Sequence, residues 1–304
     1  MVERRPGVMP PRRRRPERHR PPRSVVYRRR ALALALIAAA AVGLGFVIKS
    51  VGGGNSGPTT TAVVPPKPFR VVFPEGFTRR DMAGRVGDVA HIAAHERHVT
   101  PQLSQPSYLA ATRRPRRVVG FGLKRYPLEG FLFPATYDFT ARTTSAQLVA
   151  DQLQAFEDHW RRIDLRYARS KNLTPYDVLV IASMIEKEAL APEERPKIAR
   201  VIFNRLHLGM KLGIDATIRY ALNVPGTQSL TDPELNSRTP YNTRKYVGLP
   251  PTPIANPGLA SIQAAAHPVP GNWLYFVRKP DRVHHFFTAS AQAFADYART
   301  HGYR

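Results

Sequence analysis

The chain has 304 residues and a net charge of +24, from 46 Lys and Arg against 22 Asp and Glu. It has no cysteine, which excludes disulfides, thiolate nucleophiles and cysteine-based zinc sites. Its length allows one or two folded units beside a tail. A charge this positive favours a polyanionic neighbour, such as nucleic acid, an anionic membrane surface or an acidic wall polymer.

Much of the charge lies at the N-terminus, where residues 1–30 hold twelve Arg and two Glu. A segment this rich in Arg and Pro cannot bury a core, so a disordered basic tail is predicted. Residues 31–48 form an apolar, uncharged run that is long enough for a transmembrane helix. Arg28, Arg29 and Arg30 precede this run, so the positive-inside rule predicts a cytoplasmic N-terminus and an extracytoplasmic remainder. The long basic leader favours a single-pass anchor in the cell membrane over a cleaved signal peptide.

A small α+β module is predicted at residues 69–127, after a Gly, Ser, Thr and Pro-rich linker at 49–68. It begins with a β-like run, FRVVF (69–73), and a turn at Pro-Glu-Gly (74–76). A helix is expected from Arg79 to about Ala94.

Three histidines, His91, His95 and His98, fall on one face of that helix. Such a face can hold a metal ion, but no fourth ligand is evident nearby. An exposed polar face is therefore the favoured interpretation, and no metal site is predicted.

Residues 128–304 are predicted to form a mainly helical catalytic domain with a short C-terminal β-hairpin, which makes the fold class α+β. Between the helices and the hairpin lies a segment rich in Pro, Gly, Asn and Tyr, and its GLPPTPIANPG run (248–258) cannot be helical. The expected helices are 145–163, 175–190, 192–208 and 290–300, and the expected strands are 273–277 and 283–287.

The helix at 175–190 is the stretch that most strongly indicates chemistry. Thr174 can cap it and Pro175 suits its first turn. On a helical period Glu186 projects into an apolar stripe, whereas Glu188 points to the other side. Burial disfavours a charged carboxylate, and a protonated carboxyl can serve as a general acid on a glycosidic oxygen. The alternative is a structural glutamate that pairs with Lys187 or Arg195.

Other side chains in this region suit contact with sugars, although each type is more often structural. Tyrosines offer flat apolar faces to pyranose rings, and amide, hydroxyl and carboxylate groups offer hydrogen bonds. The candidates are Tyr137, Tyr220, Tyr241, Asn204, Asp215, Thr217 and Asn242.

The sequence resembles the YceG-like endolytic murein transglycosylases over about residues 128–290. The matching segments are LEGFLFPATYDF (128–139), IASMIEKEA (181–189), VIFNRLHLGMKLGIDATIRYAL (201–222), TPYNTRKYVGLPPTPIANPGLASIQAAAHP (239–268) and LYFV (274–277). The start of the preceding module, FRVVFPEGFTRRDMA, resembles the family's LysM-like subdomain.

The resemblance implies cleavage of the β-1,4 bond between N-acetylmuramic acid and N-acetylglucosamine in nascent glycan strands, leaving 1,6-anhydromuramic ends. It implies Glu186 as the acid and base, with Glu188 as the second choice. One carboxyl suffices because the nucleophile is the substrate's own 6-hydroxyl, so no cofactor or metal is expected. A hydrolase would need a second carboxylate, for which Asp215 is the best candidate.

The resemblance also gives Asp215, Asn204, Tyr241 and Asn242 a role in shaping the cleft or binding sugar. Glu129, in the LEGFLFP segment, is a further substrate-binding candidate. The sequence departs from the family pattern at Ala135, at Ala216 and at Gln292-Ala293-Phe294. These departures affect secondary contacts and leave the glutamate motif intact.

The expected partners are peptidoglycan glycan strands, the cytoplasmic membrane and peptidoglycan synthases. One alternative is a membrane-anchored peptidoglycan-binding scaffold without catalysis. Nucleic-acid binding rests only on the composition of the tail, and the predicted topology disfavours it.

Overall fold

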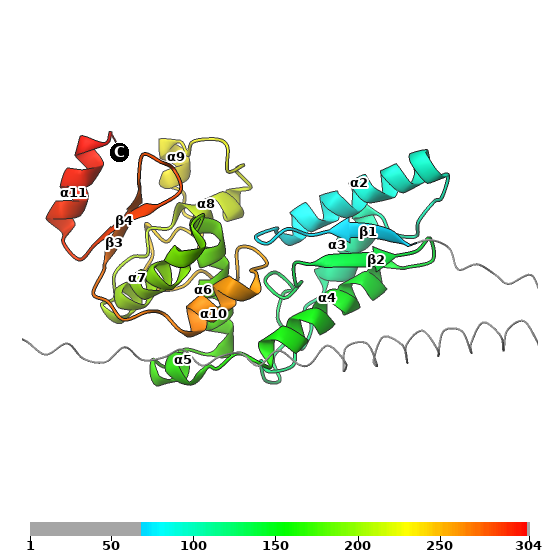
Figure 1. The fold of residues 1–304 in the computed structure, drawn as a ribbon, viewed down its shortest axis with the longest axis horizontal. Coiled ribbons are helices and arrows are strands. Elements are labelled where there is room, and N and C mark those ends of the chain that lie inside the picture. Colours follow the sequence, from blue (N-terminus) through cyan, green and yellow to red (C-terminus); the bar gives the residue numbers. More distant parts are fainter. Residues whose placement is uncertain (1–67, 303–304) are drawn as a thin grey trace, which may run out of the picture. The chain divides into compact units, whose positions relative to one another are not determined.

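A computed structural model describes residues 68–302, whose arrangement is drawn in Figure 1. The predicted tail, the predicted transmembrane segment and nearly all of the linker lie outside the described residues. Across residues 68–302, no helix is both long and apolar enough to cross a membrane.

The elements are β1 (Phe69–Val72), α2 (Arg79–Arg97), α3 (Gln105–Arg113), β2 (Thr136–Phe139), α4 (Ser145–Trp160), α5 (Arg166–Ser170), α6 (Pro175–Glu188), η1 (Pro192–Glu194), α7 (Arg195–His207), α8 (Asp215–Leu222), α9 (Asp232–Leu235), α10 (Leu259–Ala266), β3 (Tyr275–Arg278), β4 (His285–Thr288) and α11 (Ala291–Thr300).

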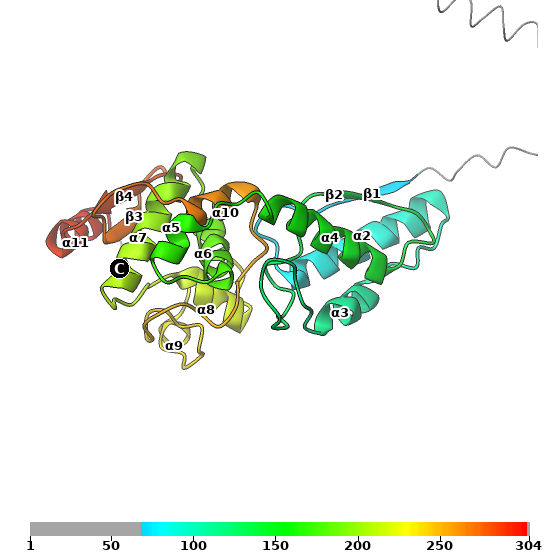
Figure 2. The ribbon, with the colours of Figure 1, turned by 90° about the horizontal axis from the view of Figure 1, so that it is seen from below.

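The first sheet joins two strands that are far apart in the sequence. β1 pairs antiparallel with β2, and Val71 lies opposite Tyr137. Helix α2 packs on β1 and on α3, and α3 packs on α4 (Figure 2). The shared core includes Phe73, Met82 and Tyr108. Both β2 and α4 come from beyond residue 127, so this group of elements extends past the boundary expected from the sequence.

Capping residues determine where α2 and α6 begin. Thr78 caps α2, and Asp81 returns a hydrogen bond to the Thr78 backbone N–H. Thr174 and Asp177 form the same reciprocal pair at the start of α6, with Pro175 in the first turn. These capping boxes satisfy backbone donors that a helix start leaves unpaired. They explain why the predicted starts at residues 79 and 175 are confirmed.

Helix α6 is the central element of the second group. Every residue from Val178 to Ile185 is buried. Helices α10, α7 and α8 pack against it (Figure 1). A helix that is apolar all round is buried on all sides. The narrow apolar stripe expected from the sequence is therefore wrong for most of α6, and both glutamates lie at its end.

The segment 211–271 holds more regular structure than the sequence indicates. Helices α8, α9 and α10 form within it. They are short, and a short helix is stabilised mainly by tertiary packing, which local propensity does not reveal. The GLPPTPIANPG run is free of helix, as predicted, and its last residue, Gly258, is the N-cap of α10.

Strands β3 and β4 form the predicted C-terminal hairpin, and Arg278 lies opposite His285 in its register. His285 is buried and bonds to Glu194 at the end of η1, with 2.7 Å between His285 Nδ1 and Glu194 Oε2. The backbone N–H of His285 donates to the same carboxylate. The hairpin is thereby fixed to the segment that follows α6.

Candidate functional site

The two glutamates at the end of α6 face opposite sides of the helix. They are two residues apart, and a helix turns about 100° per residue, so their side chains diverge by roughly 200°. Their surroundings differ in consequence.

Glu186 is held by partners on its side of α6. Its Oε2 accepts a 3.0 Å hydrogen bond from the Gly258 backbone N–H, and its Oε1 lies 3.8 Å from Arg195 Nη2. The side chain is 7% exposed. Arg195 in turn donates to Ser261 Oγ at 3.1 Å. These contacts hold the Glu186 carboxyl in one orientation.

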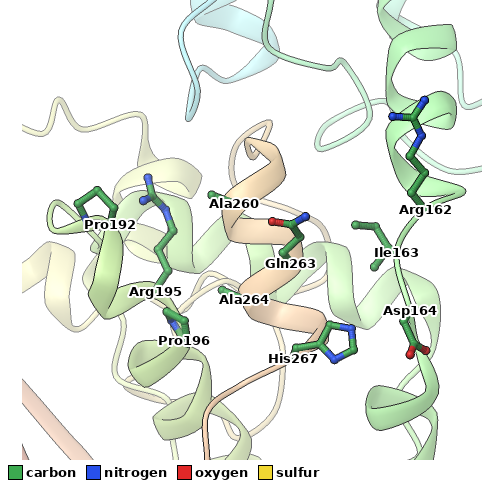
Figure 3. A pocket seen from close by; sticks show the side chains of 10 residues that line it. All are labelled: Arg162, Ile163, Asp164, Pro192, Arg195, Pro196, Ala260, Gln263, Ala264 and His267. Carbon is green, nitrogen blue, oxygen red and sulfur yellow. The ribbon is translucent and has the colours of Figure 1, made fainter. Parts of the chain in front are cut away.

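Arg195 also lines a pocket of about 430 Å³ (Figure 3). The start of α7, helix α10 and residues 162–164 form its walls. Figure 3 shows Arg162, Gln263 and His267 around it. Neither Glu186 nor Glu188 lines this pocket, but Arg195, the partner of Glu186, does.

Glu188 is half-buried, and among the described residues its carboxyl has no hydrogen-bond or ion-pair partner. Burial raises its pKa to about 7. Nearby Arg278, Arg219 and Arg244 lower the pKa, and Asp215 raises it. A carboxyl that is half protonated near neutral pH and is not tied to a partner can give a proton to a ligand and take one back.

Asp215 is engaged by Arg244, whose Nε and Nη2 both donate to its carboxylate. This bidentate pair raises the pKa of Arg244. A carboxylate neutralised in this way is poorly suited to attack an anomeric carbon. The geometry therefore does not favour the second carboxylate of a hydrolase.

Glu129 lies at a buried junction and has three partners. Its Oε1 accepts hydrogen bonds from the Arg79 backbone N–H and from Asn256 Nδ2, both at 2.9 Å. Its Oε2 accepts from the Tyr220 hydroxyl at 3.1 Å. Burial raises the pKa of Glu129 to about 7. Of the two side chains among these partners, Asn256 is buried and Tyr220 is partly exposed.

Half-buried tyrosines lie beside this junction. The rings of Tyr220 and Tyr241 are 5.4 Å apart, and the Tyr241 hydroxyl lies 2.8 Å from Thr252 Oγ1. Tyr126 and Tyr176 stack at 4.5 Å. Aromatic faces of this kind offer apolar contact to the flat side of a sugar ring. Helix α8 connects the two regions, because it carries both Tyr220 and the Asp215 that acts on Glu188.

The remaining predicted site residues have structural contacts. Asn204 donates to the carbonyls of Gly271 and Trp273, and Asn242 donates to those of Leu235 and Ser237. Thr217 is buried and bonds to Ile214 O. Tyr137 lies on β2 and donates to Phe133 O. None of these four side chains forms a hydrogen bond with Glu186 or Glu188.

The histidines of α2 do not gather around a common point. His91 and His95 stack with 4.1 Å between their ring centroids, and His98 is the C-cap of the helix. Within residues 68–302, no group of three or more His, Asp or Glu side chains is placed to hold a metal ion.

Sequence reasoning missed three residues. Arg278 is the charge that most lowers the pKa of Glu188, but nothing in the sequence indicated that this strand residue lies near Glu188. Arg195 entered only as a possible partner of Glu186. Glu75 was taken as part of a turn, and the structure places it near Glu186 and Arg195, whose charges act on its pKa.

The fold and this site define an α+β protein in which a buried helix presents one partnered and one unpartnered glutamate. The chain belongs to the YceG-like family, whose sequence model matches residues 57–300. It is 34% identical over 223 residues to an endolytic murein transglycosylase of Streptococcus pneumoniae and 32% identical over 217 residues to one of Bacillus subtilis. These alignments cover 68% and 69% of this chain. The chain spans only 40% and 59% of the length of those relatives.

A solved structure shares the fold. The crystal structure of a yceG-like protein of Listeria monocytogenes matches with a TM-score of 0.60 and 28% sequence identity. The match covers 75% of each chain.

Proposed function

We propose that this chain is an endolytic lytic transglycosylase that cleaves peptidoglycan glycan strands. The observation that carries the proposal is the last turn of α6, a buried helix that ends in the S-x-x-E-K-E motif (183–188). There the Glu186 side chain is 7% exposed and is held by the Gly258 N–H and Arg195. A buried, oriented carboxyl suits a group that gives and takes back a proton. The names of the relatives supply the reaction class.

We assign the acid to Glu186, the first glutamate of the motif and the first choice from the sequence. The Gly258 N–H and Arg195 lie against its two carboxyl oxygens, which fixes the direction of the group and leaves lone pairs for a proton. Glu188 is the second candidate, because its carboxyl is half-buried and has no hydrogen-bond or ion-pair partner among the described residues. Burial raises the pKa of Glu188 to about 7.

The proposed reaction needs one carboxyl. Protonated Glu186 gives its proton to the glycosidic oxygen between N-acetylmuramic acid and N-acetylglucosamine as the C1–O bond breaks. The resulting carboxylate takes the proton of the muramic 6-hydroxyl while O6 bonds to C1. The product is a 1,6-anhydro end, no water is consumed, and Glu186 is again protonated.

The positive charges near Glu188 support a substrate with acidic groups. Arg219, Arg244 and Arg278 act on this carboxyl from α8, the following loop and β3. Peptidoglycan carries carboxylates on its peptide stems, and opposite charges favour association. Tyr220 and Tyr241 would then contact sugar rings. Asp215 would hold Arg244 in place.

The wider organisation is also a proposal. Residues 1–30 would lie in the cytoplasm, 31–48 would span the membrane, and 49–68 would link them to a LysM-like module. That module would begin at residue 69 and include β2 and α4, and the catalytic part would follow it. The hydropathy and charge of the N-terminal sequence support this topology. An enzyme so tethered would act on strands near the synthases that make them and would stop their elongation.

The test incubates the full chain, purified in detergent, with purified peptidoglycan and identifies products by mass spectrometry. We expect anhydro-ended fragments whose rate of formation falls about a thousandfold in Glu186→Gln. Glu188→Gln should be less severely impaired. If Glu188→Gln abolishes the products and Glu186→Gln does not, the assignment of the acid is wrong.

Two other outcomes would contradict the proposed reaction. Reducing ends, one water heavier than anhydro ends, would indicate a hydrolase and direct attention to Asp215. Absence of products together with retention of intact sacculi in a pull-down would indicate a binding scaffold.

A further inference from the structure

One face of α10 forms the floor of the pocket shown in Figure 3. The start of α7 forms one wall, and residues 162–164 form the other. Figure 3 shows Arg195 and Arg162 on opposite sides of α10, with Gln263 between them. The volume of about 430 Å³ is that of an ordinary small-molecule site.

Hydrogen-bond donors without protein acceptors line this pocket. Arg162 is exposed, and among the described residues its guanidinium has no hydrogen bond or ion pair. Arg195 is 13% exposed; its Nε donates to Ser261, and its Nη2 lies 3.8 Å from Glu186. Its Nη1 has no partner within residues 68–302. The planar fork of a guanidinium matches the two oxygens of a carboxylate, so both arginines can take an acidic ligand.

The acidic residue of the lining, Asp164, is already paired. Its carboxylate accepts hydrogen bonds from Arg166 Nε at 2.8 Å and from Arg166 Nη2 at 2.6 Å. These bonds lower the pKa of Asp164 to about 2. The rest of the lining between the two arginines is mostly small and apolar, and includes Pro192, Pro196, Ala260 and Ala264. Cations on two sides and apolar surface between them suit a short peptide that carries carboxylates.

Arg195 connects this pocket to the proposed acid. It lines the pocket, and its Nη2 lies 3.8 Å from Glu186 Oε1. In peptidoglycan the peptide stem is attached to the N-acetylmuramic ring whose C1–O bond the proposed reaction breaks. The stem therefore begins close to the carboxyl that protonates the glycosidic oxygen. A site for the stem has to lie beside Glu186, and this pocket does.

We propose that this pocket, which we call the stem pocket, binds the peptide stem of the muramic unit at the cleaved bond. Arg162 and Arg195 bind carboxylates of the stem, and the apolar side chains of α10 and α7 contact its alanine methyl groups. A carboxylate bound at Nη1 of Arg195 leaves the contact with Glu186 in place. The assignment rests on the proposed function and adds a preference to it: strands with stems are cleaved faster than strands without them.

The first test compares two substrates of the full chain purified in detergent. One is un-cross-linked glycan strands with intact stems, and the other is the same strands after an amidase has removed the stems. Wild-type kcat/KM should be about tenfold higher for the strands with stems, since hydrogen bonds between charged groups are strong. In Arg162→Ala this ratio should fall to about 2, and Arg162→Lys, which keeps the charge, should retain more of it.

Arg169→Ala is the matched control. Arg169 is an exposed arginine of α5 that does not line the pocket. Its removal changes the net charge by the same amount as Arg162→Ala, so the ratio should stay as in wild type. Gln263→Glu is a second test variant, because a negative charge on the floor of the stem pocket should repel the stem and lower the ratio.

A second readout does not depend on activity. The probe is a glycan strand with a photoreactive diazirine in its stems, bound to Glu186→Gln so that it is not cleaved. Mass spectrometry should locate the cross-links in residues 162–164, 192–196 and 260–267. Cross-links there support the stem pocket even if wild type yields no anhydro ends, an outcome that would overturn only the proposed function.

Three results would overturn the stem pocket. One is equal wild-type kcat/KM for strands with and without stems. Another is the same fall of the ratio in Arg162→Ala and Arg169→Ala, because net charge, and not this pocket, would then attract the stem. The absence of cross-links in the stem pocket is the third.

Discussion

Asn256 and Glu129 lie 127 positions apart in the chain, and Asn256 Nδ2 donates a 2.9 Å hydrogen bond to Glu129 Oε1. The other polar atom of the Asn256 side chain is hydrogen-bonded too: Oδ1 accepts from the N–H groups of Gly130 and Leu132. Its Nδ2 also donates to Phe77 O. A single amide therefore joins three segments around the buried carboxyl of Glu129. Buried polar groups with complete sets of partners specify one arrangement of the chain.

The raised pKa of Glu129 predicts how stability depends on pH. Because the folded-state pKa is about 7 and the ordinary value is 4.5, the folded state binds the proton more tightly than the unfolded state. This contribution is complete below about pH 4.5 and is lost as the pH rises through 7. Glu129→Gln mimics the protonated form, so its urea midpoint should vary less over this range than that of wild type.

Glu129→Ala provides the comparison. It would leave the Arg79 N–H and the Asn256 amide without their acceptor, at a cost of about 1–3 kcal/mol at any pH. If wild type and Glu129→Gln show the same pH dependence between pH 4.5 and 7, Glu129 is not the group that titrates.

The pH profile of the proposed reaction distinguishes the two glutamates. With Glu186 as the acid, Arg278→Ala should leave the basic limb of the kcat/KM profile in place. Arg278 lowers the pKa of Glu188, so a shift of that limb to higher pH would instead identify Glu188 as the acid. The measurement is the initial rate of anhydro-end formation between pH 5 and pH 9, a range chosen to bracket that pKa.

Arg282→Asn is the control for Arg278→Ala. It removes a positive charge from the same hairpin, and asparagine tolerates the left-handed conformation of this residue, φ 61°. Equal shifts in the two variants would mean that net charge, and not the position of Arg278, sets the profile.

Gly130 and Gly84 should respond in opposite ways to substitution by alanine. At Gly130, where φ is 90°, a methyl group would lie 2.6 Å from the Pro253 ring, so Gly130→Ala should lower the free energy of unfolding by about 1–3 kcal/mol. At Gly84, inside α2, nothing lies within 4 Å of the new Cβ, so Gly84→Ala should raise it by about 0.5–1 kcal/mol. Thermal unfolding of both variants measures the pair, and a stabilised Gly130→Ala would mean that the Pro253 ring does not occupy this space.

The Glu194–His285 pair should hold the hairpin that carries Arg278. Glu194→Ala leaves the His285 ring and backbone N–H groups buried without an acceptor, which should cost about 3 kcal/mol. Its neighbour Glu193 contacts His284 with a side chain that is 67% exposed, so Glu193→Ala should cost less than about 0.5 kcal/mol. Urea unfolding compares the two, and equal midpoints would show that the buried pair does not stabilise the fold.

Local patterns in the sequence determined much of this protein. The capping residues Thr78 and Thr174 and the proline at 175 start α2 and α6 where they were predicted, because these signals act within one helical turn. The hairpin and the last helix were found from alternation and turn residues for the same reason. The motif at 183–188 supplied both candidate acids, Glu186 and Glu188.

Only the tertiary structure decided what depends on distant neighbours. The sequence could not show that β1 pairs with β2, since the partner of a strand is not encoded in its own alternation. Nor could it show which glutamate carboxyl has hydrogen-bond or ion-pair partners. The helical period puts Glu186 and Glu188 on opposite sides of the helix, but it does not say which side packs against other segments. Gly258 and Arg195 close the side of Glu186. The Glu188 carboxyl has no hydrogen-bond or ion-pair partner among the described residues. Packing between distant segments, and not local propensity, fixes the surroundings of each carboxyl.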